Sequence, residues 1–225
     1  MIKYILFDLD GTLLDFKAGE RNAFTDTINK FTNYKLKEED ILKFSGINER
    51  LFNEFASGKI KERIIFQEAR FKEIYEYLGI DANVSESNKY YVESLKYQVN
   101  KYSDVDSCIK YLYGKYKLYI ASNGQSMVQY KRLETSGLDK YFEKYYISED
   151  AGANKPDVEF FNYIFTDLND NDKDSYIIIG DRDNTDILGG INAGIKTMLL
   201  NRDDVNIKYH ADYEIKSLDE IKDIL

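Results

Sequence analysis

The stretch that decides the fold is Lys3-Tyr-Ile-Leu-Phe-Asp-Leu-Asp-Gly-Thr-Leu-Leu-Asp15. Its first part, up to Leu9, is an apolar run rich in aromatic and branched residues, typical of a buried strand in a parallel sheet. Asp8, Asp10 and Gly11 end this run. In open α/β sheets ligands bind beyond the carboxyl ends of strands, so two carboxylates there are well placed for chemistry. Asp and Gly also dominate ordinary turns, and the motif alone fits a polar turn about as well.

The composition is that of a globular protein with a substantial core. Of the 225 residues, 43% are hydrophobic and 32% are charged, which excludes the fibrous and disordered classes. This length fits one large domain, or a core of about 140 residues with an inserted module. The net charge of −9 argues against binding to nucleic acid polymers or anionic membranes, which need a basic face. A small anion would need a metal ion, a lysine or helix N-termini nearby.

Cysteine usage and the start of the chain predict a cytoplasmic protein. Cys108 is the only cysteine, so no internal disulfide is possible. No apolar run is long enough to span a membrane, and Asp8 and Asp10 interrupt the apolar start too early for a signal peptide. We therefore expect no membrane partner. The sequence does not give the oligomeric state.

From Gly19 to about Lys101 the apolar residues recur three and four apart, which predicts helices and no strand. Helices are expected over 19–32, 38–56 and 85–101. A further helix is marked by an apolar stripe that Gly79 ends. The stripe consists of Ile60, Ile64, Phe71, Ile74, Tyr75 and Leu78.

From Ser103 the chain alternates helices and strands. Strands are expected over 117–123, 144–148, 175–181, 196–201 and 213–215, and helices over 104–114, 125–136, 157–168, 185–193 and 217–224. This alternation predicts an α/β fold, a Rossmann-like three-layer core with a mainly parallel sheet. A lone buried strand cannot satisfy its backbone among helices. We therefore expect residues 1–15 and 103–225 to form the core, with 16–102 inserted as an all-helical domain.

Polar residues follow four of the expected strands. They are Asp8 with Asp10, then Ser122-Asn123-Gly124, then Lys155 in a loop, and finally Gly180-Asp181 with Asp186. Because parallel strands end at the same edge of a sheet, these four groups should meet there. Ser, Lys and Asp of an ordinary surface would instead scatter along helix faces. The coincidence points to an active site.

These motifs, in this order, resemble the haloacid dehalogenase (HAD) superfamily of aspartate-nucleophile hydrolases, most of which are magnesium-dependent phosphatases. The similarity covers the whole chain: Asp8-Leu-Asp10-Gly-Thr12, Ser122-Asn123-Gly124, Lys155-Pro156 and Gly180-Asp181-Arg-Asp-Asn-Thr-Asp186. The inserted helices correspond to the helical C1-type cap of that superfamily.

The resemblance implies a phosphatase mechanism. Asp8 is the expected nucleophile, which forms an aspartyl-phosphate, and Asp10 the general acid/base. Dehalogenases of the superfamily generally lack the second aspartate, so Asp10 favours phosphate chemistry. Asp8, Asp181 and the backbone carbonyl of Asp10 are the expected Mg²⁺ ligands. Asp186 would lie in the second coordination shell, where it would orient a metal-bound water or Lys155.

Phosphate binding is expected from the second and third motifs. Ser122 and the backbone N–H groups of Asn123 and Gly124 would hold the phosphate at the start of the next helix. Lys155 would add a positive charge opposite Asp8. The Asn123 side chain has a second interpretation, since it could simply cap that helix.

Four other polar or small features have ordinary interpretations that we favour. Arg63 and Arg70 lie beside the apolar stripe, as cations that flank an apolar face commonly do, although they could also reach a substrate. Arg182 is interpreted as a surface side chain, with pairing to nearby carboxylates as the alternative. Gly189-Gly190 suggests close packing on the sheet. His210 lies in a polar loop and is expected to be exposed.

A narrower resemblance concerns the bacterial pyrimidine 5′-nucleotidase branch of the superfamily. It is carried by Gln129-Tyr-Lys-Arg-Leu, Ile147-Ser-Glu-Asp-Ala-Gly and Phe160-Phe-Asn-Tyr, by Asp186-Ile-Leu-Gly-Gly-Ile-Asn-Ala-Gly, and by Arg70-Phe-Lys-Glu-Ile-Tyr-Glu-Tyr-Leu-Gly in the helical insert. This resemblance is better support for a common origin than for a particular substrate, because fold and lineage do not determine the ligand. The expected substrate is a small phosphorylated metabolite, first a nucleoside 5′-monophosphate. A sugar-phosphate or phosphoglycolate phosphatase and a phosphomutase remain alternatives, and a non-catalytic binding module is the weakest.

Overall fold

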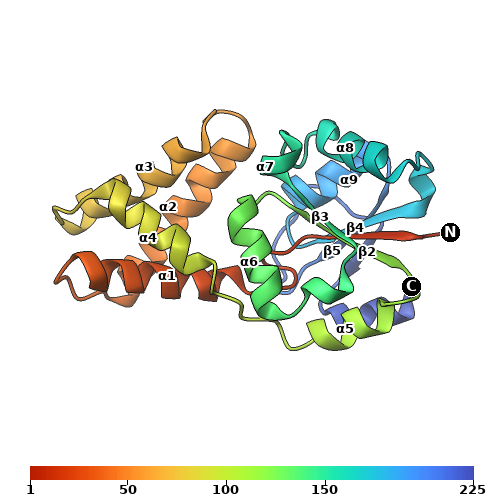
Figure 1. Cartoon of the computed structure of the whole chain (residues 1–225), viewed down its shortest axis with the longest axis horizontal. Coiled ribbons are helices and arrows are strands. Elements are labelled where there is room, and N and C mark those ends of the chain that lie inside the picture. Colours follow the sequence, from red (N-terminus) through yellow and green to blue (C-terminus); the bar gives the residue numbers. More distant parts are fainter. The chain divides into compact units, whose positions relative to one another are not determined.

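The computed structural model describes all residues from Met1 to Leu225, which form two compact units (Figure 1). The first unit consists of Met1–Asp15 and Asn100–Leu225, and the second of Phe16–Val99. The chain thus leaves the first unit after its first strand and returns at Asn100, where the sequence suggested residue 103.

The first unit is built on a six-stranded sheet in which every neighbouring pair is parallel. Its strands are β1 (Tyr4–Phe7), β2 (Lys117–Ser122), β3 (Lys144–Ile147), β4 (Tyr176–Gly180), β5 (Lys196–Leu200) and β6 (Tyr213–Ile215). They lie in the order β3-β2-β1-β4-β5-β6. The order reverses between β1 and β4, and ligands of such sheets bind at this switch point. The predicted α/β class is confirmed.

Helices cover both faces of this sheet, as Figure 1 shows for α5 on one side and α8 and α9 on the other. Side chains of β1 alternate between the two apolar layers, with Ile5 and Phe7 in one and Leu6 in the other. The helices are α5 (Val105–Leu112), α6 (Ser126–Ser136), α7 (Ser148–Ala151), α8 (Val158–Leu168) and α9 (Leu188–Ala193). Cys108 is buried in the layer beneath α5.

Shorter helical segments depart from the predicted α-helices. The helix expected over 185–193 begins as the π-helical segment η3 (Asp183–Ile187) and continues as α9, and the last helix is the 3₁₀ segment η4 (Leu218–Asp223). Two more 3₁₀ segments are η1 (Asp139–Tyr141) and η2 (Lys173–Ser175). Gly190 packs closely on the sheet, since a Cβ there would lie 2.4 Å from Thr197 Cγ2.

The second unit contains four helices, α1 (Phe16–Phe31), α2 (Glu38–Ala56), α3 (Arg63–Leu78) and α4 (Val84–Leu95). The predicted helix 85–101 was too long, because α4 ends at Leu95. Lys101 instead pairs with Leu14 in an antiparallel bridge of the first unit, and the Asp15 N–H donates to the Asn100 carbonyl at 2.7 Å. Gly79 ends α3 in the left-handed conformation, as predicted.

The predicted stripe of α3 needs correction at two residues. Ile64 is exposed, and Ile60 precedes the helix. Aromatic side chains dominate the packing of this unit, with Phe24 and Phe44 stacked at 4.0 Å and Phe71 against both Phe44 and Tyr91. Arg63 lies at the edge of this packing, with its guanidinium 4.9 Å from the centre of the Phe55 ring.

Arg70 does not flank an apolar face, contrary to the favoured interpretation, because its side chain is buried inside the second unit. Its guanidinium donates to Asn48 Oδ1 at 3.0 Å and to Asn88 Oδ1 at 2.9 Å, and it lies over the Tyr91 ring. Asn48 in turn donates to the buried carboxylate of Glu20 at 2.6 Å. A continuous polar network therefore joins the four helices.

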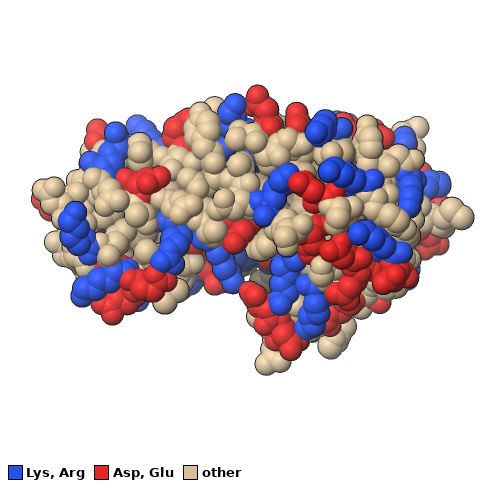
Figure 2. Space-filling model, turned by 90° about the horizontal axis from the view of Figure 1, so that it is seen from below, with Lys and Arg blue, Asp and Glu red and all other residues tan.

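The surface carries both signs of charge. On the face drawn in Figure 2, acidic and basic side chains are interspersed and no broad basic area is visible. None of the helices is long and apolar enough to cross a bilayer. His210 is exposed, as predicted.

We expect Arg70→Met to destabilise the protein by about 3 kcal/mol, because the buried Glu20 carboxylate loses its counter-charge and two asparagine oxygens lose their donor. Urea unfolding followed by circular dichroism would measure this. The matched control is Arg21→Met, which removes an exposed pair with Glu38 and should leave the unfolding curve unchanged. Equal curves for the two variants would contradict the structural role of the network.

Candidate active site

The site is built where neighbouring strands end. Asp8 directly follows β1, Ser122 is the last residue of β2, and Asp181 directly follows β4. The Asp8 N–H donates to the Ile179 carbonyl of β4 at 2.9 Å, which fixes the height of this aspartate on the sheet. Since β1 lies between β2 and β4, the three side chains share one edge at the switch point.

Lys155 joins these strand ends from the segment between β3 and α8. Its ammonium donates to Asp8 Oδ1 at 2.7 Å, to Asp186 Oδ1 at 2.6 Å and to the Ala121 carbonyl. The side chain is 1% exposed. Its three N–H donors are matched by three acceptors, which a buried ammonium requires. The two carboxylates raise the pKa of Lys155 against the opposing effect of burial.

Asn123 positions the backbone of Lys155. Its side-chain amide donates to the Lys155 carbonyl at 2.8 Å, and its Oδ1 accepts from the Lys155 N–H at 2.8 Å. The side chain thus ties the end of β2 to the loop that carries the lysine. The N-cap position of α6 is Gln125, two residues further along the chain. The expected backbone contact to a phosphate stays a prediction.

Three carboxylates face each other beside this lysine. One oxygen each of Asp8, Asp181 and Asp186 lies within 4.8 Å of the others. Burial and the neighbouring carboxylates raise the pKa of Asp8 well above its ordinary value. Burial, together with the charge of Asp186, raises the pKa of Asp181 to about 6. Both shifts show that ionising these carboxyl groups is unfavourable in this buried place.

A divalent cation fits this group chemically. With all three carboxylates ionised, the group carries three negative charges, which the ammonium of Lys155 and the charge of Arg182 offset only in part. Carboxylate oxygens are also the ligands that Mg²⁺ prefers. The oxygens of Asp186 accept from Lys155 and, at 3.0 Å, from the Arg182 N–H. Asp8 and Asp181 stay the predicted ligands of the ion, and Asp186 the residue that holds Lys155.

The loop after β1 is shaped around Asp181. Gly11 has a φ of +88°, and a Cβ at this position would lie 2.3 Å from Asp181 Oδ2. Only glycine allows the carboxylate to approach so closely in this conformation. Thr12, two residues from Asp10, donates its hydroxyl to Asp181 Oδ1 at 3.1 Å. This loop therefore holds Asp181 as well as supplying Asp10.

Arg182 is half-buried, and its charge partly offsets the rise in the Asp181 pKa. This influence favours the alternative interpretation, in which Arg182 acts on the nearby carboxylates. Its backbone N–H also holds Asp186, so this residue contributes to the acidic group in two ways.

Asp10 contacts two residues of α6 that the sequence interpretation did not assign to the site. Gln129 Nε2 donates to Asp10 Oδ2 at 2.6 Å, and the Arg132 guanidinium donates to Asp10 Oδ1. Both residues lie in the stretch that carries the resemblance to nucleotidases. The available signal was their spacing, which places both on the helix face that also carries the buried Leu133.

Ser122 lies at the turn that leads into α6. Its Oγ accepts from the Gly124 N–H at 3.2 Å and from Gln129 Nε2 at 2.8 Å. The first N–H of α6, at Ser126, donates to Glu149 Oε2 at 2.8 Å. An anion bound here would therefore meet the turn of Ser122 to Gly124 before the helix itself.

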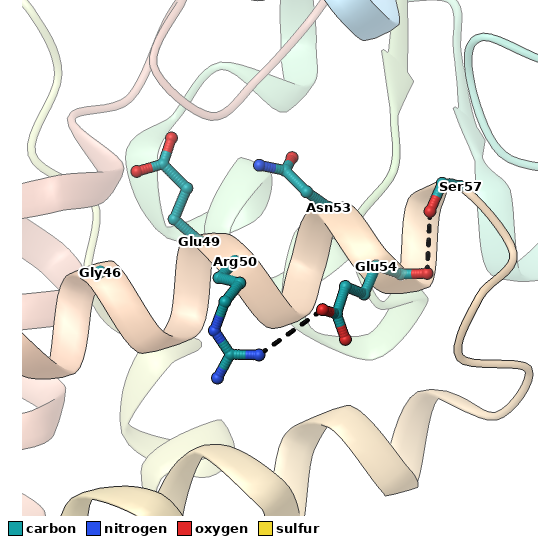
Figure 3. Close-up of a pocket in the computed structure, with 6 residues that line it drawn as sticks. All are labelled: Gly46, Glu49, Arg50, Asn53, Glu54 and Ser57. Carbon is teal, nitrogen blue, oxygen red and sulfur yellow. Dashed lines mark hydrogen bonds and ion pairs between the residues drawn. The ribbon is translucent and has the colours of Figure 1, made fainter.

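A separate pocket of about 480 Å³ lies on α2, in the second unit (Figure 3). Figure 3 shows Glu49 and Asn53 extending from one side of the helix and Arg50 and Glu54 from another, with Arg50 3.6 Å from Glu54. None of the residues that line it is a predicted site residue. The pocket is therefore distinct from the acidic group.

The parallel sheet and the polar groups at its carboxyl edge are those expected of an enzyme with an α/β fold. The chain belongs to the haloacid dehalogenase-like hydrolase family, whose profile matches residues 5–200. This confirms the predicted family and enzyme class.

The relatives include two pyrimidine 5′-nucleotidases. PynA of Streptococcus pneumoniae is 32% identical, covering 99% of this chain and 94% of its own length. YjjG of Escherichia coli is 30% identical over 88% of this chain and 85% of its own length. The HAD-hydrolase YfnB of Bacillus subtilis is 33% identical, and its crystal structure superposes with a TM-score of 0.93 over 100% of this chain and 98% of that one. The predicted similarity to the nucleotidase branch is confirmed.

We expect Asp181→Asn to stabilise the metal-free protein at pH 7 by about 1 to 3 kcal/mol, because it removes one of the crowded carboxylates. The folded-state pKa of about 6 lies above the ordinary 3.8, so the ionised Asp181 destabilises the folded protein. This destabilisation is complete above pH 6. The gain should shrink as the pH falls from 6 to about 4. Thermal unfolding with a chelator, across this pH range, would measure it.

The control for this measurement is Asp174→Asn, the same chemical change at an exposed position. It should leave the melting temperature unchanged across the range. A lower melting temperature for Asp181→Asn at pH 7 would show that the carboxylate stabilises the metal-free site.

Proposed function

We propose that this enzyme is a cytoplasmic, Mg²⁺-dependent phosphomonoesterase that hydrolyses nucleoside 5′-monophosphates, pyrimidine ones first. The observation that carries the proposal is the placement of Asp8, with Lys155 at 2.7 Å, beside Asp181 and near Ser122 at the sheet edge. The two nucleotidase relatives support the substrate class. The magnesium-bound crystal structure of the Bacillus subtilis relative supports the choice of metal.

In the first proposed step, an oxygen of Asp8 attacks the phosphorus of the ester. The bond from phosphorus to the leaving oxygen breaks as the Asp8–phosphorus bond forms, and Asp10 gives its proton to the leaving oxygen. Ser122, with the N–H groups of the following turn, holds the phosphoryl oxygens. The product of this step is an aspartyl-phosphate and a free nucleoside.

In the second step, water attacks the phosphorus and gives a proton to Asp10, while the bond to Asp8 breaks and inorganic phosphate leaves. Mg²⁺ held by Asp8, Asp181 and the Asp10 carbonyl would reduce the repulsion between carboxylate and phosphate. Lys155 keeps the Asp8 carboxyl fixed throughout. Asp186 orients Lys155 through its contact at 2.6 Å.

The helical unit is proposed to serve as the cap domain that the family resemblance implies. Residues 16–102 were assigned to it from the sequence, and the compact unit spans Phe16–Val99. The crystal structure of the Bacillus subtilis relative is described as revealing interdomain movement, which supports a mobile cap.

A substrate panel tests the proposed activity. With Mg²⁺ present, kcat/KM for UMP and CMP is expected to exceed that for glucose 6-phosphate and phosphoglycolate by about tenfold or more. Release of inorganic phosphate would be measured for each ester. Equal or higher values on the non-nucleotides would overturn the nucleotidase proposal, and conversion to an isomer without phosphate release would indicate a mutase.

Asp8→Asn is expected to lower kcat on UMP by at least about a thousandfold, because the amide cannot form the aspartyl-phosphate. Single-turnover phosphate release would measure the loss, with circular dichroism to verify folding. Asp174→Asn, at the exposed position used above, is the matched control and should keep the wild-type rate. Full activity of Asp8→Asn would exclude this residue as the nucleophile.

A further inference from the structure

Helix α6 presents two buried polar side chains to the loop after β1. Gln129 and Arg132 are three residues apart, so they lie on the same face of the helix. Each is only 1% exposed. A buried guanidinium and a buried amide both need partners, and the choice of partners shows what they hold.

These partners include the proposed acid/base and the proposed phosphate ligand. Gln129 Nε2 donates to Asp10 Oδ2 at 2.6 Å and to Ser122 Oγ at 2.8 Å. Arg132 Nη1 donates to Asp10 Oδ1 and, at 3.0 Å, to Gln129 Oε1. One amide group therefore connects Asp10 to Ser122, and the arginine braces both the amide and the carboxylate.

The arginine also determines which way the amide points. A guanidinium can only donate, so the Gln129 group that faces it must be the oxygen. The NH₂ group is then directed at Asp10 and Ser122, and its two hydrogens are matched by two acceptors.

Gly124 provides the space for this amide. A Cβ at Gly124 would lie 2.3 Å from Gln129 Nε2. The turn that carries Ser122 and the glutamine side chain are therefore in direct contact. Any shift of Gln129 would change the relation between this turn and Asp10.

We propose that Gln129 and Arg132 are positioning residues that fix the Asp10 carboxyl relative to Ser122. They thereby set the distance between the proton donor and the phosphoryl group, an inference that rests on the proposed phosphatase function. Each carboxyl oxygen has two acceptor positions, so one donor on each still leaves a position that faces the leaving oxygen. The proton of Asp10 moves from that position to the leaving oxygen as the bond to phosphorus breaks.

A purely structural role for the pair is the weaker explanation. Leu133, on the same helix, is already buried in the apolar layer of the sheet. A buried ion pair adds little stability compared with apolar side chains of similar size. The pair contacts Asp10 and Ser122, the two groups whose spacing matters for proton transfer. It does not fill a gap in the apolar core.

The test compares two phosphate esters that differ in their need for a proton. Loss of the ribose oxygen from UMP requires protonation, whereas p-nitrophenolate leaves p-nitrophenyl phosphate unprotonated. Gln129→Met keeps the length of the side chain and removes both donors. It is expected to lower the first-turnover rate on UMP about 10- to 100-fold, with less than about threefold loss on p-nitrophenyl phosphate. The KM for UMP should stay within about twofold.

Arg132 is tested in the same way. Arg132→Met should reproduce the selective loss on UMP, and Arg132→Lys should recover part of the UMP rate because it keeps a charged donor. Gln129→Asn retains an amide on a shorter side chain. It gives a second measurement at position 129 of the rate on UMP relative to the rate on p-nitrophenyl phosphate. The matched control is Lys131→Met, at a position between the two, whose ammonium pairs with Glu134 at 2.9 Å. It should match the wild-type rates on both esters.

The outcomes separate the two proposals. A wild-type protein that hydrolyses neither ester overturns the proposed function, and this inference falls with it. A wild-type protein that hydrolyses both, with variants at positions 129 and 132 that lose the two activities equally, overturns the inference alone. A selective loss on UMP supports it.

Discussion

The structure of the site depends on one buried ammonium group. Lys155 contacts Asp8 after β1, the Ala121 carbonyl in β2 and Asp186 after β4. It therefore joins three segments at the strand ends through a single set of donors. An ammonium in such a place is tolerated only when each donor is matched. This requirement fixes where the Asp8 carboxylate lies. Asn123 contributes by holding the backbone of Lys155 in place.

The same group of residues is destabilising in the absence of a cation. Burial raises the pKa values of both Asp8 and Asp181, and the neighbouring carboxylates raise them further. Asp181 stays close to the other carboxylates despite the repulsion, because Gly11 leaves room for it and Thr12 donates a hydrogen bond to it. Unfavourable electrostatics kept in place by specific contacts are typical of functional sites. The repulsion is also the physical basis of the proposed binding of a divalent ion.

The sequence was informative wherever the relevant pattern is local. Alternating helices and strands define the parallel sheet, and its strand ends placed Asp8, Ser122 and Asp181 at one edge. Arg70 and the pair on α6 were missed because the burial of a polar side chain depends on partners far along the chain, such as Asn48 for Arg70. The end of α4 was misjudged for the same reason, since the following residues pair with the loop after β1. Periodicity carries none of this information.

Asp8 and Asp10 are two residues apart but lie in different electrostatic surroundings. Asp8 faces the single ammonium of Lys155 within the acidic group, whereas Asp10 faces the guanidinium of Arg132 and the amide of Gln129. The lysine comes from the loop after β3, and the other two from α6. Two carboxylates of one motif can serve as nucleophile and acid/base only if their surroundings differ. Here that difference arises because separate elements of the fold supply the partners of each carboxylate.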